Sequence, residues 1–416
     1  MNLRWLTGLA FAMSFGGIPF GFAAESLRLE EAVSRSLISN QSLAAEAADL
    51  RAVQIRAERE GLSTPYIVGG DLENFAGTGS SRGLQGAEAT LRLGRVIELG
   101  GKRAARQALG TAEIMQQQHL SDNMRLEVAS RTTARFIKVL ADQHRLVFAR
   151  EQVRLAERTR REVGNWVTAG RNPESDLHAA EIALGEAELK REHAEHELGS
   201  AKVSLASSWS SFSPDFTRVE GNLHKLPPIA PFEALTALLP KTMAYRSSVF
   251  EAETISARRR LAEASAKPDI DLSLGVRRLE GLDDQGLVMS VSVPLGSKPR
   301  AALAIAEADA QLSALDSRRE AQRAESHQAL FGMYQELKHA HTEYEALRSR
   351  LLPKAEQAFG VARRGFENGR LSFASLAQAQ RTLFELRERS VDVAARYHTL
   401  LVDVERLTAV SSEVTP

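Results

Sequence analysis

The chain has 416 residues, of which 43% are hydrophobic, and this is enough for two or three ordinary domains or for one elongated domain. Lysine plus arginine and aspartate plus glutamate are balanced at 53 each, so no net charge favours a nucleic acid or an anionic surface as a partner. The sequence contains no cysteine, which excludes disulfides, thiolate metal sites and a lipid-modified N-terminal cysteine.

Residues 1–23 have the pattern of a secretory signal peptide. Arg4 supplies a positive charge before an apolar run from Trp5 to Phe20, and Gly21 and Ala23 are small residues at a cleavage site. A retained anchor is less favoured, because the apolar run is shorter than the ~20 residues that a membrane-spanning helix needs. Since no later stretch is long and apolar enough for such a helix, we expect an exported chain that could enter a membrane only through β-strands.

The next stretch predicts a broken helix followed by a β-hairpin. Residues 27–63 are rich in alanine, glutamate, arginine and leucine, with a break at Asn40 and a proline after their end. Residues 66–75 alternate only loosely between apolar and polar side chains, and residues 87–99 alternate more regularly, as strands with one apolar face do. The glycine- and serine-rich residues 77–86 predict a flexible hairpin tip.

A long helical hairpin is predicted after these strands. Residues 104–166 contain no proline, and a helix of ~60 residues would extend ~90 Å at 1.5 Å per residue. Steps of three and four mark a loose coiled-coil seam that consists of Leu126, Ala129, Thr133, Phe136, Leu140, His144 and Val147. A turn at residues 169–173 is followed by a second helix that continues to about Ser207.

The same order of elements then recurs. Residues 269–279 and 286–294 alternate as strands and lie between helical stretches. Pro353 predicts a break in the last long helical rod. The turn at Gly369 matches the turn at Gly170. We therefore expect a mainly α protein with β-strands, built from two repeats of helix, β-hairpin and long helices. Its parts are the signal peptide, a first repeat at 24–213, a proline-rich linker at 214–231, a second repeat at 232–410 and a C-terminal tail at 411–416.

The strand pattern requires several copies of the chain. A lone hairpin with an apolar face is marginal, and four strands cannot close a barrel. If the apolar sides meet lipid, every edge must be paired, and three chains would supply twelve strands. The residues that would face lipid are Leu91, Leu93, Leu272, Leu274, Met289 and Val291. The polar alternates that would line a water-filled path are Glu88, Arg92, Asp271 and Arg277.

A glycine-containing stretch follows each second strand and precedes a helix. The joint residues are Leu99, Gly100, Gly101, Lys102, Leu295 and Gly296. The first stretch does not fit a phosphate loop, because Val96 and Arg103 stand where glycine and serine or threonine are needed. We interpret both stretches as joints at which the chain leaves the sheet and turns into a helix, with Lys102 and Arg103 at the membrane rim.

These features together resemble the TolC family of outer membrane efflux proteins, and residues 98–103 are similar to its CzcC-like heavy-metal branch. The resemblance includes residues 27–32, residues 352–358, and the turn at 369–371 followed by residues 376–380. It implies a homotrimer with a twelve-stranded outer-membrane barrel on a long periplasmic helical barrel. It also implies a duct for heavy-metal cations that works with a periplasmic adaptor protein and an inner-membrane RND pump.

The two helical turns are the candidates for contact with the adaptor, and they present Gly170, Arg171, Gly369 and Arg370. The alternative is that each is simply a well-made helix turn. Some ducts of this family carry paired aspartates just beyond the second turn, where this chain has Ser375 and Gln378. Asp176 is the acidic group available on the first turn, so these three residues are the aperture candidates.

The sequence predicts no enzyme, no cofactor and no resident metal site. His193 and His196 could form a metal pair, but a solvated helix face is favoured, and His339 and His341 point to different sides of a helix. No Gly-x-Ser-x-Gly motif or compact pair of carboxylates is present.

Two other functions remain open. The duct could carry drugs or secreted polypeptides, or the chain could be a soluble periplasmic coiled-coil scaffold. Aromatic residues make up only 6% of the chain, and Tyr66 and Phe75 are the candidates for an interfacial girdle.

Overall fold

The computed structural model describes residues 26–410, so the predicted signal peptide and C-terminal tail lie outside the described residues. The chain is mainly helical with one four-stranded antiparallel sheet, which confirms the predicted fold class. Within residues 26–410, no helix combines the length and the apolar composition that crossing a membrane requires. The chain forms two compact units, and each takes segments from both halves of the sequence.

One unit, Glu46–Ser121 together with Ala244–Gln322, contains the sheet. Its strands neighbour one another in the order β2 (Tyr66–Glu73), β3 (Glu88–Ile97), β5 (Ile270–Leu279) and β6 (Asp284–Ser292). Both predicted hairpins are therefore present, and β3 pairs with β5 to join them. The first hairpin loop contains η2 (Gly79–Ser81), and the second contains η5 (Glu280–Leu282).

Helices precede both β-hairpins, as predicted. Asn40 separates α1 (Leu29–Ser39) from α2 (Gln41–Glu60), and its side-chain oxygen accepts the N–H of Ser42 at 2.9 Å. This bond replaces a helical one and starts the new helix. In the second half, η4 (Leu239–Lys241) interrupts the helical stretch before α6 (Met243–Ser265).

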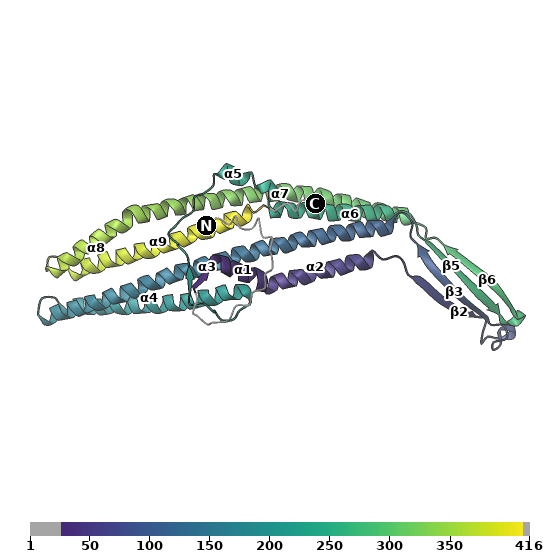
Figure 1. Cartoon of the computed structure of the whole chain (residues 1–416), viewed down its shortest axis with the longest axis horizontal. Coiled ribbons are helices and arrows are strands. Elements are labelled where there is room, and N and C mark those ends of the chain that lie inside the picture. The colour runs from purple at the N-terminus through teal and green to yellow at the C-terminus, as the bar shows by residue number, and fades with distance from the viewer. Residues whose placement is uncertain (1–25, 411–416) are drawn as a thin grey trace, which may run out of the picture. The chain divides into compact units, whose positions relative to one another are not determined.

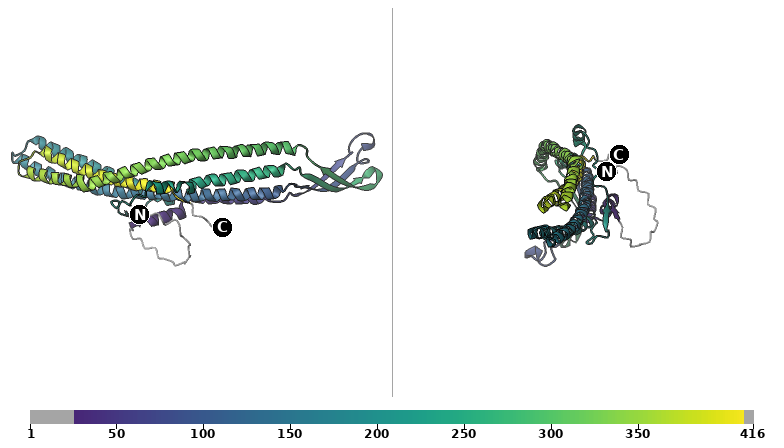
Figure 2. Two further views of the ribbon diagram at one scale, coloured as in Figure 1. Left: turned by 90° about the horizontal axis from the view of Figure 1, so that it is seen from above. Right: turned by 90° about the vertical axis from the view of Figure 1, so that its left-hand side faces the viewer.

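The other unit contains two helical hairpins, except for residues 102–121 of the first helix, which belong to the sheet unit. α3 (Lys102–Thr168) runs for 67 residues and turns back into α4 (Glu174–Ala206). α8 (Leu352–Glu367) turns back into α9 (Phe373–Leu407). The two hairpins lie side by side in each direction of view (Figure 1, Figure 2).

A π-helical turn, η6 (Leu347–Leu351), connects α7 (Ser297–Ala346) to α8. It lies directly before Pro353, which has no N–H to donate and whose ring crowds the carbonyl one turn earlier. The widened turn removes this conflict without ending the helix. The predicted break at Pro353 is therefore a local change of helix type.

A short parallel strand pair ties the start of the described chain to the linker. β1 (Ser26–Arg28) pairs with β4 (Arg218–Glu220), and Leu27 is in register with Val219. The predicted helix from residue 27 is wrong for its first two residues, because they extend along β4. The surrounding linker also contains η3 (Ser207–Trp209) and α5 (Phe232–Thr236).

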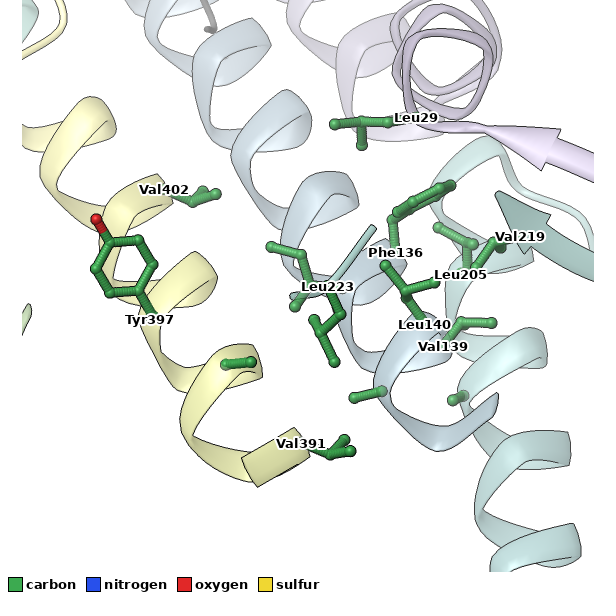
Figure 3. Close-up of a cluster of buried hydrophobic side chains, with 14 of the residues drawn as sticks. Leu29, Phe136, Val139, Leu140, Leu205, Val219, Leu223, Val391, Tyr397 and Val402 are labelled. Atoms are coloured by element: carbon green, nitrogen blue, oxygen red, sulfur yellow. The ribbon is translucent and has the colours of Figure 1, made fainter. Parts of the chain in front are cut away.

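The main core of the hairpin unit lies between α1, α3, α4, α9 and the segment after β4 (Figure 3). Its members include Leu29, Phe136, Leu140, Leu205, Val219, Leu223, Val391, Tyr397 and Val402. The predicted seam on α3 contributes Phe136 and Leu140 to this core. Val147 at the end of the seam is 50% exposed instead, because it lines an open hollow beside β4.

Candidate functional site

One face of the sheet is continuously apolar, because the register of the strands aligns their apolar residues. Residues Val68, Leu93, Leu274 and Met289 form one row across the four strands. Residues two positions away lie on the same face, so all six residues predicted to face lipid share it, and each is exposed. An exposed apolar face of this size on a monomer marks a surface that something else covers.

The opposite face of the sheet is polar and contains an ion-pair network. It carries the four residues predicted to line a water-filled path, namely Glu88, Arg92, Asp271 and Arg277. Arg277 donates to Glu88 and to the Thr90 hydroxyl at 2.9 Å each, and to Glu73 at 3.3 Å. Arg92 pairs with Asp71 at 3.1 Å. The sheet therefore has one apolar face and one charged face.

Both edges of this sheet are open among residues 26–410. β2 and β6 each have one strand neighbour, on their inner side. Because all neighbours are antiparallel, β6 of one copy can pair in the same sense with β2 of another. An open edge on an apolar sheet favours pairing with a further strand.

Glycines bend the chain sharply where strands give way to helices. Gly100, Gly101 and Gly296 have φ of +83°, +76° and +89°, a region that side chains with a Cβ rarely adopt. At Gly100 a Cβ would also lie 2.6 Å from the carbonyl oxygen of Ala264. These angles are what the predicted joints require, and Leu295 beside Gly296 is 92% exposed.

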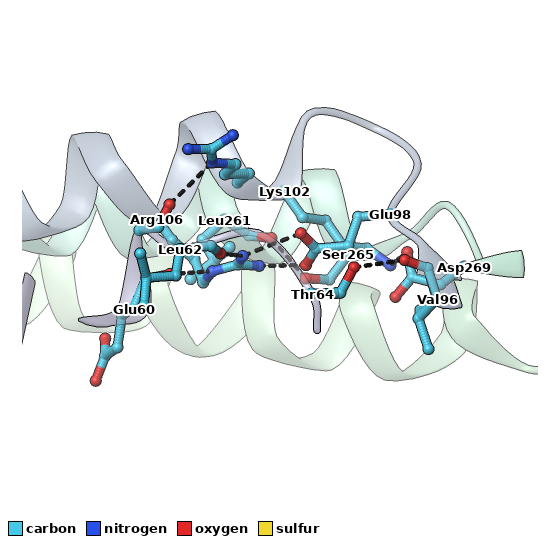
Figure 4. A network of polar contacts seen from close by, with 12 residues as sticks. Glu60, Leu62, Thr64, Val96, Glu98, Lys102, Arg106, Leu261, Ser265 and Asp269 are labelled. Atoms are coloured by element: carbon cyan, nitrogen blue, oxygen red, sulfur yellow. Dashed lines mark hydrogen bonds and ion pairs between the residues drawn. The ribbon is translucent and has the colours of Figure 1, made fainter. Parts of the chain in front are cut away.

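A clasp of partly buried charges holds the first joint together (Figure 4). The Arg106 guanidinium forms two bonds to the Glu98 carboxylate and donates to the carbonyls of Glu60 at 2.6 Å and Leu62 at 3.2 Å. It thus connects the end of α2, the end of β3 and the start of α3. The hydrogen bonds from Arg106 lower the pKa of the Glu98 carboxyl, so this carboxyl stays ionised.

A second ion pair closes the same clasp. Asp269, just before β5, accepts the Lys102 ammonium at 2.6 Å and the N–H of Leu99 at 3.1 Å. The Lys102 side chain is only 11% exposed, and Arg103 donates to the Gly61 carbonyl at 2.9 Å. Both cations therefore hold the joint, Lys102 from a mostly buried position and Arg103 from an exposed one.

The first helical tip is closed by a Schellman motif. Gly170 has φ of +69° and donates its N–H to Val167 at 2.9 Å, and Arg171 donates to Trp166 at 2.8 Å. Gly170 and Arg171 are exposed. The tip therefore offers a fixed backbone and one cation to the solvent.

The second tip repeats this geometry. Gly369 has φ of +66°, and Gly369 and Arg370 donate to Phe366 and Gly365 at 2.8 Å each. The two tips also pack together, since the rings of Trp166 and Phe366 lie 4.5 Å apart. The two hairpin ends thus share one hydrophobic cluster, which includes the aromatic rings of Trp166 and Phe366, and each end carries one exposed arginine.

The three aperture candidates each contact a residue three or four positions away in the sequence. Asp176 accepts the Asn172 amide at 2.7 Å, the N–H of Ser375 donates to Ser372 at 3.3 Å, and Gln378 donates to Thr382 at 3.4 Å. Among the described contacts, none joins one candidate to another. Within one chain they do not form a cluster.

The histidine pairs show no metal geometry. His196 lies 3.6 Å from Glu192, His339 lies 3.7 Å from Glu343, and both imidazoles are exposed. Across residues 26–410, no three histidine or acidic side chains come together as a metal site would require.

Comparison with known protein families found no match. Among curated proteins, the chain is similar to the cobalt-zinc-cadmium resistance protein CzcC of Cupriavidus metallidurans, with 27% identity over 387 residues that cover 92% of this chain and 90% of that protein. Among solved structures, it is similar to CusC, with a TM-score of 0.77, 13% identity and 92% of each chain covered. This chain therefore has the fold of CusC.

A second solved structure has the same fold. The outer membrane protein VceC from Vibrio cholerae gives a TM-score of 0.69 at 16% identity, with 92% of this chain and 97% of that chain covered. These structures are described as an outer membrane protein and a transmembrane channel, and not as enzymes. The shared fold thus extends over 92% of this chain.

Sequence reasoning missed two features of the site. The arginine of the clasp, Arg106, was not singled out, although the charge pair Glu98 and Arg106 at a spacing of eight flanks the predicted joint. The strand β4 was hidden inside a proline-rich linker. Its three residues are too few to produce an alternating pattern.

Proposed function

We propose that this chain is a TolC-family protein, the outer-membrane duct of a tripartite efflux system that exports heavy-metal cations. The observation that carries the proposal is the match over 92% of the chain to a protein named for cobalt, zinc and cadmium resistance. The sheet supports it, because a membrane duct needs an apolar face toward lipid and a polar face toward water.

The duct is a homotrimer in this proposal. Three copies of the four-stranded sheet supply twelve strands, and pairing β6 of each copy with β2 of the next removes every open edge. Leu274 and Met289 then face lipid, and the Arg277 network faces the water-filled path. The arrangement accounts for both the exposed apolar face and the open edges.

The charge of the polar face supports a cationic cargo. On the four strands this face carries the carboxylates of Asp71, Glu73, Glu88, Asp271 and Asp284 and the guanidinium groups of Arg92 and Arg277. The excess of negative charge raises the local concentration of cations in a narrow aqueous path. It needs no metal site, since a conduit does not have to retain its cargo.

The helical hairpins form the periplasmic part in this proposal. Exposed Arg171 and Arg370, held on rigid turns, are the residues that we assign to the contact with a periplasmic adaptor. Asp176, Ser375 and Gln378 lie just beyond these turns, where three chains would surround an aperture. An inner-membrane pump supplies the energy, and this chain catalyses no reaction.

Cell fractionation and a tolerance panel test this proposal. The duct predicts recovery in the outer membrane as a trimer, whereas a periplasmic scaffold would be recovered in the soluble fraction. In a deletion strain we expect lower tolerance to cobalt, zinc or cadmium, restored by the gene on a plasmid. Loss of drug tolerance with unchanged tolerance to every metal would instead support a drug duct.

A further inference from the structure

The segment of residues 219–227, which begins within β4 and continues beyond it, lies across helices of both helical hairpins. We call it the strap. At its start, the Gln143 side chain on α3 donates to the Val219 carbonyl at 3.1 Å and accepts the Val219 N–H at 2.7 Å. At its end, the Tyr397 hydroxyl on α9 donates to the Pro227 carbonyl. Leu223 between them is 1% exposed and lies in the core (Figure 3).

Three imidazoles surround the middle of the strap. His224 of the strap has its Nδ1 3.0 Å from the Tyr344 hydroxyl on α7 and its ring 5.1 Å from that of His144 on α3. His398 on α9 donates from Nε2 to the Leu223 carbonyl at 2.9 Å. One histidine thus comes from the strap and one from each hairpin.

The surroundings of this cluster disfavour positive charge. The ionisable groups around it are the three imidazoles themselves, Arg348 on η6, and the neutral hydroxyls of Tyr344 and Tyr397. His341 lies beside Tyr397, and Arg218 and Glu220 line an open hollow together with His144. Burial lowers the pKa of His144, His224 and His398, and no carboxylate contributes to any of these shifts among the described groups. Burial raises the pKa of Tyr397 to about 12, so its hydroxyl remains a donor.

We propose that the strap is a proton-sensitive coupling between the two helical hairpins: it holds them together while His144, His224 and His398 are neutral, and it detaches when they take up protons. Charging His224 places it beside His144 and Arg348, and among the described contacts it forms no ion pair with a carboxylate; charging His398 places a second cation against Leu223. Protonation therefore favours states in which the strap leaves the core and its imidazoles reach water.

The direction of the pH dependence follows from the lowered pKa values. Above the ordinary histidine pKa of about 6.5, folded and released states are both neutral, and the strap keeps its full stability. Below that value the released state binds more protons, so stability falls as pH decreases toward the folded-state pKa values. Acidification of the periplasm would thus loosen the coupling of the hairpins and change the opening of the proposed duct.

Hydrogen exchange of the full chain in detergent tests the coupling. We expect protection of a peptide covering the strap, corrected for intrinsic exchange rates, to fall at least several-fold between about pH 7.5 and pH 5.5. Residues 362–372 at the second tip contain no histidine and serve as an internal control whose protection stays constant. Equal protection of the strap at both pH values would overturn the proposal.

A triple variant, H144Q/H224Q/H398Q, removes the titrating groups and should remove the pH dependence, whereas H178Q/H193Q/H196Q on the exposed face of α4 should keep it. If the triple variant does not fold, the singles H224Q and H398Q should each reduce the pH effect. The link between the strap and the opening of the duct rests on the proposed function, and a separate measurement of conductance tests it. Absence of conductance in planar bilayers at either pH contradicts the duct, while pH-independent exchange contradicts the strap.

Discussion

The side-chain amide of Gln143 forms two hydrogen bonds with the backbone of Val219, donating at 3.1 Å and accepting at 2.7 Å, as a neighbouring strand would. On its other side Val219 is in register with Leu27 of β1. The strap therefore begins at a residue held from two directions.

Replacing Gln143 by leucine should loosen this attachment. The change leaves the N–H and carbonyl of buried Val219 without partners, which costs roughly 1–3 kcal/mol. We expect a lower thermal midpoint together with faster hydrogen exchange in the strap. Gln152→Leu, on the same helix and half-buried, is the matched control and should leave exchange in the strap unchanged.

Arg106→Lys should weaken the joint after β3. A lysine cannot make the two bonds to Glu98 together with those to the Glu60 and Leu62 carbonyls, so we expect a loss of about 2–3 kcal/mol. Thermal melts in detergent provide the measurement. Arg59→Lys changes an arginine that is 72% exposed and should alter stability by less than about 0.5 kcal/mol. A similar loss in both variants would contradict the clasp.

The same clasp predicts sensitivity to acid. Because the folded-state pKa of Glu98 is lowered, its contribution is complete above its ordinary pKa and is lost as pH falls through the lower folded value. Arg106→Lys should therefore flatten the dependence of the melting temperature on pH in this acidic range.

The two adjacent glycines of the first joint, Gly100 and Gly101, can be compared directly. Gly101→Ala places a Cβ in open space and should cost only the backbone strain of a positive φ, about 1–2 kcal/mol. Gly100→Ala adds a clash with the Ala264 carbonyl, so its cost should be clearly larger. The melting temperatures of the two variants measure this difference in stability. Equal melting temperatures would show that the backbone at Gly100 can move to avoid the clash.

Most of the fold could be predicted from local sequence, for identifiable reasons. The strands around Leu274 and Met289 alternate regularly, and the turns at Gly170 and Gly369 carry glycine at the one position that needs a positive φ. The strap could not be predicted, because its contacts join Val219 to Gln143 and Leu223 to His398 across 76 and 175 positions. No periodicity encodes such pairings. The aperture candidates, which were carried over from family resemblance, also remain predictions.

The facing of the strands can be tested with one pair of neighbours. Val291 lies on the apolar face and Ser290 on the polar face of β6. An arginine at 291 in a lipid-facing strand should cost roughly 2–4 kcal/mol and lower the yield of trimer in the outer membrane, whereas Ser290→Arg should be tolerated. A normal trimer yield for Val291→Arg would reverse the assigned facing.

Release of metal from living cells tests the central claim most directly. Cells with and without the gene are loaded with zinc, cobalt or cadmium, and the metal that reaches the medium is measured over time. The proposed duct predicts slower release in the deletion strain for at least one of these cations, with the retained metal recovered by osmotic shock, and restoration by the wild-type gene but not by Val291→Arg. Equal release of all three metals from both strains would contradict it.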